Sequence, residues 1–241
     1  MLKFLFFFSL FMVLVLVWHF ATRKYLNPYK LTFIFGKKGA GKTTILCKYA
    51  FQYLRKGWKV YSTEGYPGTY LIKPEDIGYF HFPPNSCIIC DEVGMIWDLR
   101  NHKNFKPEVR DFFKLQRHNK LRVILASQTF DIDKKIRDLT DDMYLLSKSF
   151  RVFSYAKRIL RKTVLVEASG DGASRIDENL VFDSFLFFWC GSRCFTFIPK
   201  YAKYFDSFSP SQLPVKHFEL VPGWEESDRK KLLRIQGIKK R

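Results

Sequence analysis

Apolar runs with the spacing of strands alternate with amphipathic runs of helical spacing over most of the chain. The strand-like runs lie at residues 31–35, 59–63, 87–90, 121–126 and 143–146, and helical spacing occupies 45–56, 107–120 and 131–139. This alternation predicts an α/β domain with a mostly parallel sheet. The run Cys-Ile-Ile-Cys at 87–90 contains no polar residue, so we expect a strand buried on both faces and its cysteines in the core.

The second half of the chain is predicted to contain mainly strands and loops. Further strands are expected at 150–155 and 163–166, a polar loop at 168–178, and a hairpin with arms 185–190 and 193–198 around a Gly191-Ser192 turn. The stretch 64–85 is rich in glycine and proline, and we expect a loop there with one helical turn near Pro74.

The first segment of the chain has almost no polar side chains. Between Phe4 and Phe20 only Ser9 and His19 are polar, and this helix would be about 26 Å long. The length is near the short end of what spans a bilayer. More cations follow the segment than precede it, which predicts that the rest of the chain lies in the cytoplasm. A cleaved signal peptide is disfavoured because small residues are missing at the cleavage position.

These patterns divide the chain into three parts. Residues 1–24 are predicted to be a single-pass transmembrane anchor in the cytoplasmic membrane, residues 25–167 the α/β core, and residues 168–241 a β-hairpin region with a basic tail. The tail from Trp224 onward is a charged helix candidate. It can lie on anionic lipid or nucleic acid, or it can be a frayed, solvated end.

A glycine-rich segment connects the first predicted strand of the core to the helix that follows. Its sequence is GKKGAGKTT, and its members are Gly36, Lys37, Lys38, Gly39, Ala40, Gly41, Lys42, Thr43 and Thr44. Small glycines allow backbone N–H groups to surround a phosphate, and the helix N-terminus adds partial positive charge. Lys42 can reach the β- and γ-phosphates, and the Thr43 hydroxyl can ligate Mg²⁺. The segment therefore predicts a phosphate-binding loop for ATP.

Two carboxylates follow the buried strand at 87–90. Because parallel strands end at the same edge of a sheet, Asp91 and Glu92 should lie beside the glycine-rich loop. We expect Asp91 to hold Mg²⁺ through water and Glu92 to orient and polarise the water that attacks ATP. No other metal site is assigned.

Two further polar residues are catalytic candidates beside Lys42 and Glu92. Gln128 comes just after the strand at 121–126, where it either senses the γ-phosphate or caps the strand. Arg117 precedes that strand. It either reaches the nucleotide of a neighbouring subunit in a ring or is a solvated surface residue.

The charge of the chain points to an anionic partner. The formal net charge is +18 and aromatic residues make up 18% of the sequence, with cations interleaved among aromatic residues between 150 and 166. Such a surface could bind a nucleic-acid strand, and a solvated strand edge protected by lysines is the plainer alternative. Five cysteines form no secreted disulfide framework in a chain of this size, although Cys190 and Cys194 could pair across the predicted hairpin.

Four segments together resemble a known family. They are GKKGAGKTT, CIICDE, RHNKLRVILASQTFDIDKKIRDLTDDMYLLSK and YFDSF, and they fall within roughly residues 31 to 208. The family is that of the zonular occludens toxin, whose filamentous-phage members include the gene I protein. These members are similar to RecA-like motors of the FtsK/HerA type, and they drive virion assembly and extrusion of single-stranded DNA at the inner membrane.

The resemblance implies a RecA-like P-loop NTPase with an N-terminal transmembrane helix and a small C-terminal β-hairpin region. It also implies a homo-oligomeric ring, phage coat and other assembly proteins as partners, and a location in the host inner membrane. By position it implies Lys42 as the nucleotide lysine, Thr43 and Asp91 at Mg²⁺, Glu92 as the catalytic acid and Gln128 at the polar strand end.

One feature departs from the better-known members of that family. They carry the membrane helix after the ATPase domain and before an exported region, whereas here the hydrophobic segment comes first.

Two other functions stay open. One is a partition-type or septum-positioning membrane ATPase, because Lys37 lies where that class has an extra lysine. The other is a membrane scaffold that binds ATP as a switch, which would not need the water-activating carboxylate of Glu92.

Overall fold

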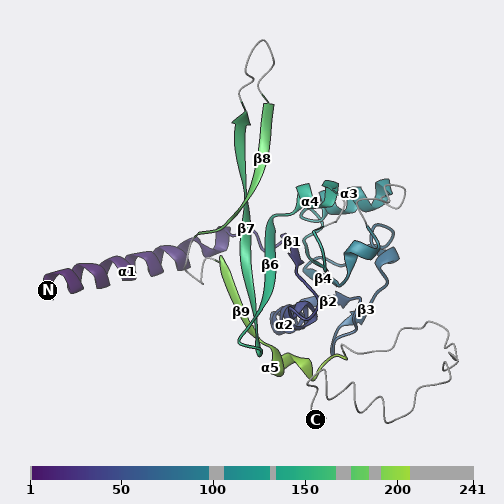
Figure 1. The fold of residues 1–241 in the computed structure, drawn as a ribbon, viewed down its shortest axis with the longest axis horizontal. Helices are drawn as coiled ribbons and strands as arrows, with labels where there is room; N and C mark the ends of the chain where they lie inside the picture. Colours follow the sequence, from purple (N-terminus) through teal and green to yellow (C-terminus); the bar gives the residue numbers. More distant parts are fainter. Residues whose placement is uncertain (1, 98–105, 131–133, 167–174, 185–190, 207–241) are drawn as a thin grey trace, which may run out of the picture. The chain divides into compact units, whose positions relative to one another are not determined.

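The computed structural model describes residues 2–97, 106–130, 134–166, 175–184 and 191–206. Within these residues nine strands form one sheet (Figure 1). The strands are β1 (Leu31–Phe35), β2 (Lys59–Ser62), β3 (Tyr70–Leu71), β4 (Ser86–Cys90), β5 (Leu121–Ser127), β6 (Asp142–Ser149), β7 (Phe153–Val166), β8 (Arg175–Phe182) and β9 (Arg193–Phe197). The α-helices are α1 (Leu2–Thr22), α2 (Lys42–Arg55), α3 (Pro107–Leu115), α4 (Lys134–Leu139) and α5 (Ile198–Ala202). Three 3₁₀ turns are η1 (Arg23–Tyr25), η2 (Pro74–Asp76) and η3 (Val93–Met95).

The sheet is mostly parallel, as the alternation of strands and helices predicted. Its order is β3-β2-β4-β5-β1-β6-β7-β8, with β9 also paired to β7. The strands from β3 to β6 are parallel to one another. β7 is antiparallel to β6, β8 and β9. The carboxyl ends of β1, β2, β4 and β5 therefore meet at one edge, which is the edge where ligands bind in open α/β sheets.

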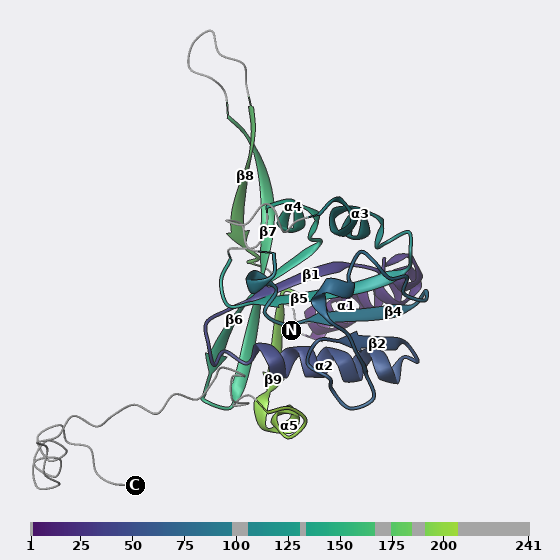
Figure 2. The ribbon, with the colours of Figure 1, turned by 90° about the vertical axis from the view of Figure 1, so that its right-hand side faces the viewer.

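Both faces of the parallel part of the sheet are covered. Figure 2 shows α2 on one face and α3 and α4 on the other. Ile45 and Leu46 of α2 pack with Ile34 and Ile124 on the first face. On the second face the core includes Val109 and Phe113 of α3, Ile136 of α4 and alternate residues of the same strands. This two-sided burial explains why β4 and β5 are mostly apolar and do not alternate between apolar and polar residues.

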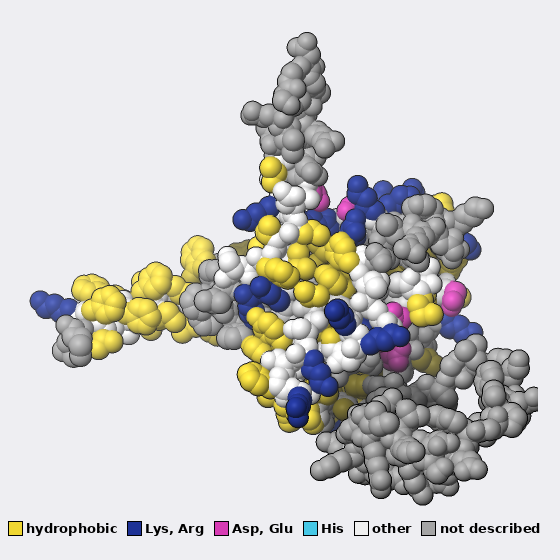
Figure 3. Space-filling view, in the orientation of Figure 1, with side chains coloured by type: hydrophobic (Ala, Val, Ile, Leu, Met, Phe, Trp, Pro, Cys, Tyr) yellow, Lys and Arg dark blue, Asp and Glu magenta, His cyan; other side chains and the backbone are white. Residues whose placement is uncertain are grey.

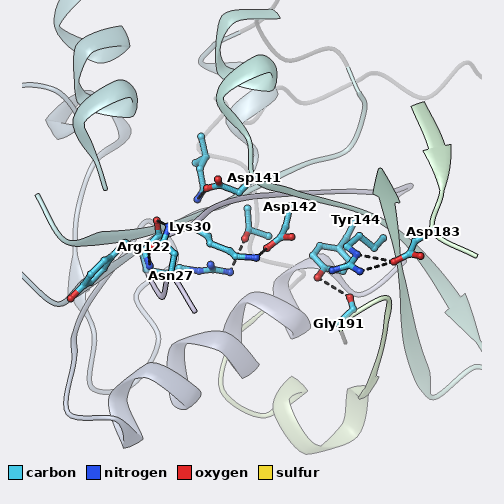
Figure 4. Close-up of polar contacts among 12 residues, drawn as sticks. Asn27, Lys30, Arg122, Asp141, Asp142, Tyr144, Asp183 and Gly191 are labelled. Atoms are coloured by element: carbon cyan, nitrogen blue, oxygen red, sulfur yellow. Dashed lines mark hydrogen bonds and ion pairs between the residues drawn. The ribbon is translucent and has the colours of Figure 1, made fainter. Parts of the chain in front are cut away.

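Polar contacts fasten the amino edge of the sheet (Figure 4). Lys30 Nζ lies 3.0 Å from Asp142 Oδ2, and the Leu31 N–H donates to Asp141 Oδ2 at 2.7 Å, which ties the start of β1 to β6. Farther along the sheet, Arg158 of β7 donates from both Nε and Nη2 to Asp183 Oδ2. A two-donor contact of this kind fixes orientation as well as position, so it holds the end of β8 against β7.

Several expectations about the bounds of strands and helices were wrong. The strands expected at 150–155 and 163–166 are one strand, β7, and residues 150–152 form its entering turn. β8 occupies residues 175–182, part of which was expected to be loop, and the short strand β3 lies in the expected loop 64–85. α3 ends at Leu115 and not at 120. β7 was not recognised as one strand because charged side chains interrupt its apolar pattern. Such side chains are tolerated because this part of the sheet is not covered on both faces.

Two other expectations concern residues near 190. The first hairpin arm, 185–190, and Cys190 lie outside the described residues. The second arm is β9, which pairs with β7. The Sγ of Cys194 lies 3.1 Å from Lys48 Nζ.

α1 contains a candidate membrane span. The stretch Lys3–Thr22 has a mean hydropathy of 2.4, and none of it is buried against the rest of the described chain. In length and composition alone it is able to cross a membrane.

Candidate functional site

The glycine-rich loop lies between β1 and α2 at the carboxyl edge of the sheet. The Gly36 N–H donates to the Ser127 carbonyl at 3.2 Å, which fixes the loop to the end of β5. A Cβ on Gly36 would lie 2.5 Å from the Leu146 carbonyl oxygen, so a larger residue does not fit between β1 and β6. Gly39 and Gly41 have φ angles of 75° and 90°, which favour glycine. The loop therefore has the sharp backbone course that turns N–H groups toward a phosphate.

Lys42 begins α2, and its side chain folds back over the loop. Its Nζ donates to the Gly36 carbonyl at 3.0 Å, and the residue is 8% exposed. Lys37 and Lys38, by contrast, are exposed. The structure therefore distinguishes one lysine held inside the loop from two at its rim.

Thr43 and Asp91 are far apart in the sequence, and the fold brings their side chains into contact. Thr43 Oγ1 donates to Asp91 Oδ2 at 2.9 Å, joining the first turn of α2 to the end of β4. The Asp91 N–H in turn donates to Thr63 Oγ1 at 3.0 Å. Burial raises the pKa of Asp91, although the hydrogen bonds from Thr43 and from the Glu92 N–H act in the opposite direction. A hydroxyl and a carboxylate this close fit a shared Mg²⁺, which prefers oxygen ligands.

Glu92 lies next to this pair in an unusual backbone conformation. Its φ of 52° is in the left-handed region, where a non-glycine residue is strained, and its N–H donates to Asp91 Oδ1 at 2.9 Å. It directly precedes the 3₁₀ turn η3. Strain of this kind is concentrated at functional sites, where it orients a side chain.

Gln128 and Arg117 lie at opposite ends of β5. Gln128 follows Ser127, whose carbonyl binds the Gly36 N–H, so the structure brings Gln128 to the loop edge. Arg117 is exposed before the start of β5, and the strand between them spans about 20 Å. The structure therefore does not bring Arg117 to the site of its own chain, and a role in a neighbouring subunit's site stays a prediction.

Sequence reasoning missed two residues near the site. Glu64 follows β2, which pairs with β4, so it emerges beside Asp91. Desolvation raises the pKa of Glu64, and the charges of Asp91 and Glu92 raise it further. Ser154 of β7 is fully buried, and its Oγ donates to the Ala40 carbonyl of the loop at 2.7 Å. A polar residue following β2 could have pointed to Glu64, whereas Ser154 carries no signal before the pairing of β7 is known.

These elements define a class of fold. The parallel strand β1 leads through a glycine-rich loop into α2. A carboxylate pair follows β4, which is separated from β1 in the sheet by β5. This is the arrangement of a P-loop NTPase, with its loop and its acidic strand end at one sheet edge.

Comparison with known proteins agrees with the resemblance seen in the sequence. The family model of the zonular occludens toxin (Zot) matches residues 75–163. This stretch includes Asp91, Glu92 and Gln128 and begins after the glycine-rich loop. The predicted resemblance is thereby confirmed. A comparison with curated proteins gave no match.

Three solved structures illustrate the likeness of fold. The N-terminal domain of the zonular occludens toxin from Neisseria meningitidis has a TM-score of 0.40 and 19% identity, covering 65% of this chain and 95% of that one. The genome packaging NTPase B204 from Sulfolobus turreted icosahedral virus 2, in complex with ATP-γS, has a TM-score of 0.42 and 13% identity, covering 52% and 77%. The flagellar accessory protein FlaH from Methanocaldococcus jannaschii has a TM-score of 0.40 and 14% identity, covering 54% and 77%.

Proposed function

We propose that this chain is a membrane-anchored ATPase that drives filamentous phage assembly and the extrusion of single-stranded DNA through the host membrane. The observation that carries the proposal is the 2.9 Å contact between Thr43 Oγ1 and Asp91 Oδ2, with Lys42 and Glu92 beside it. A metal-ligating hydroxyl, a metal-ligating carboxylate, a phosphate-binding lysine and a water-activating carboxylate are what hydrolysis of a nucleoside triphosphate requires.

Each residue of the site has a distinct chemical task in this proposal. The backbone of residues 36–44 holds the phosphates, and Lys42 exchanges the Gly36 carbonyl for a phosphate oxygen. Mg²⁺, held by Thr43 and by Asp91, would neutralise charge that develops on the phosphates. Glu92 orients and polarises the attacking water, and Gln128 detects the γ-phosphate from the end of β5.

Three properties support the membrane and DNA parts of the proposal. α1 has the length and hydropathy of a span, and the cations that follow it favour a single-pass anchor with the ATPase in the cytoplasm. The net charge of +18 suits a polyanionic partner. The match to the Zot family supports the resemblance, and the resemblance implies assembly at the inner membrane, a homo-oligomeric ring and coat proteins as partners.

The test is ATP turnover by the full-length protein in detergent, without DNA, with a single-stranded oligonucleotide and with duplex DNA. The proposal predicts Mg²⁺-dependent turnover that single-stranded DNA stimulates. Stimulation by duplex DNA alone would favour the partition-type alternative. Nucleotide binding without any turnover would favour the scaffold, and either of these results would overturn the proposal.

A further inference from the structure

One face of the antiparallel part of the sheet carries a group of aromatic rings that are partly exposed to solvent. Figure 3 shows hydrophobic side chains gathered over β6, β7 and β9, with Lys and Arg side chains among them and Asp and Glu at the margins. We call this surface the ring patch. It consists of Phe153, Tyr155, Lys157, Phe182, Phe195 and Phe197.

The register of the strands places these residues on one face. Phe153 pairs with Phe197 and Tyr155 with Phe195 across β7 and β9, with Lys157 next along the same side of β7. Because side chains alternate along a strand, the intervening Ser154 and Ala156 point to the opposite face and are buried there. The glycine-rich loop and α2 pack on that opposite face, so they do not lie over the ring patch.

The rings form pairs and remain accessible. The centroids of Phe153 and Phe197 are 5.3 Å apart, and those of Tyr155 and Phe195 are 4.7 Å apart with a tilt of 30°. Phe195 and Phe197 are 46% and 45% exposed. Exposed rings are costly in water, and a contiguous group of them marks a binding surface.

The charge among the rings selects the kind of partner. Lys157 Nζ lies 4.1 Å from the centroid of Phe182, which is 49% exposed. A second copy of a chain with a net charge of +18 would meet like charge here. A single-stranded nucleic acid supplies bases for the rings and phosphates for the cations.

We propose that the ring patch binds single-stranded DNA, with bases stacked on the Tyr155–Phe195 and Phe153–Phe197 pairs and a phosphate at Lys157. The inference rests on the DNA part of the proposed function and adds the surface that performs it. β7 joins this surface to the nucleotide site, because Ser154, on its opposite face, binds the Ala40 carbonyl of the loop. DNA bound at Phe153 and Tyr155 would thus contact the two residues of β7 that flank Ser154, which binds the loop.

The experiment measures binding of a fluorescent oligothymidylate to the full-length protein in detergent, by anisotropy, over a range of salt concentrations. Tyr155→Leu with Phe195→Leu keeps apolar area but removes two stacking rings, and we expect affinity to fall about tenfold or more with an unchanged salt dependence. Lys157→Ala should lower the slope of log affinity against log salt by about 0.7, the value for one phosphate contact on a single strand.

The matched control is another exposed pair of ring and cation, Tyr79 with Lys106, whose Nζ lies 5.4 Å from the ring centroid. Tyr79→Leu with Lys106→Ala should bind DNA as the wild type does. Melting temperature and binding of a fluorescent ATP analogue report whether each variant folds.

The outcomes separate this inference from the proposed function. If the wild type binds DNA and the ring-patch variants bind equally well, the inference fails and the proposed function stands. If the wild type hydrolyses ATP but binds no single-stranded DNA, the DNA parts of both fail. If the ring-patch variants change the oligomer mass measured by light scattering and leave DNA affinity intact, the surface is an interface between copies and the inference is overturned.

Discussion

At the scale of single residues, the site combines groups that are held at some energetic cost. Lys42 is nearly buried with a backbone carbonyl as its hydrogen-bond partner, Asp91 is desolvated, and Glu92 has a left-handed backbone. Each of these conditions is unfavourable in a protein that binds nothing. Binding of Mg²⁺ and phosphates would offset the cost of burying the charges of Lys42 and Asp91.

Removal of the Lys42 side chain tests the phosphate-binding role. Lys42→Ala should weaken ATP binding by about tenfold to a hundredfold, the range for one charge-assisted hydrogen bond. Titration with a fluorescent ATP analogue measures this. Lys38→Ala is the control, because Lys38 lies exposed on the same loop. Equal affinities for the two variants would show that Lys42 does not contact the phosphates.

The charge of Asp91 gives a prediction about pH. Because burial raises the pKa of Asp91, the folded state holds the proton more tightly than the unfolded chain, and ionisation of Asp91 lowers stability at neutral pH. Asp91→Asn should therefore raise the melting temperature at pH 7 in the absence of Mg²⁺. The difference from the wild type should shrink as the pH falls through the raised pKa. A variant less stable than the wild type at pH 7 would contradict this.

At the scale of elements, β7 connects the ring patch to the glycine-rich loop. One face of this strand carries the ring patch, and the other holds the glycine-rich loop through the hydrogen bond from Ser154 to Ala40. The contact is close, since a Cβ on Gly41 would lie 2.9 Å from the Cβ of Ser154. A shift of β7 would therefore be transmitted directly to the loop.

Ser154 is a positioning residue for the loop, and its removal should affect ATP binding more than the chemical step. Ser154→Ala should cost about 1 kcal/mol of stability and raise the KM for ATP severalfold, with a smaller change in kcat. Ser147→Ala on β6 is the control, because its hydroxyl makes only a 3.5 Å exposed contact to the Tyr155 carbonyl. A loss of stability without a change in KM would mean that Ser154 is merely structural.

The elements that the sequence predicted well are those whose residues have a single physical environment. β1, β4 and β5 are buried on both faces and gave mostly apolar runs, and the glycines between β1 and α2 are required by the loop backbone. β7 was split in two because its exposed face carries Lys157 and Arg161, which resemble loop residues in a linear pattern.

The candidate site could be predicted from local sequence only in part. Lys42, Thr43 and Asp91 follow from strand ends and glycine spacing, and the structure brings them together. The pairing of β2 with β4 places Glu64 beside them, and the pairing of β6 with β7 places Ser154 behind the loop. Contacts of this kind depend on the order of strands in the sheet, and local periodicity does not specify that order.

At the scale of the whole molecule, the proposed function gives α1 the role of a membrane anchor. Its apolar side chains are uncovered, and Leu10 and Leu14 are 45% and 59% exposed. We expect the full-length protein to stay in the membrane pellet after alkaline carbonate extraction. Leu10→Arg with Leu14→Arg adds about 6–8 kcal/mol to the cost of insertion and should release the protein from the pellet.

The control for this experiment adds the same two charges elsewhere. Leu71 and Phe80 are 72% and 66% exposed outside α1, so Leu71→Arg with Phe80→Arg should leave the protein in the pellet. Release of this control as well, or retention of the α1 variant, would contradict a spanning role for α1.

The central claim is that Glu92 activates water for ATP hydrolysis at this site, and its most direct test is the comparison of Glu92→Gln with Glu64→Gln. Both carboxylates lie near Asp91, and only Glu92 directly follows it in the strained conformation. We expect Glu92→Gln still to bind ATP but to lose about a hundredfold or more in kcat, whereas Glu64→Gln should stay within severalfold of the wild type. Wild-type turnover in Glu92→Gln, or a loss confined to Glu64→Gln, would contradict it.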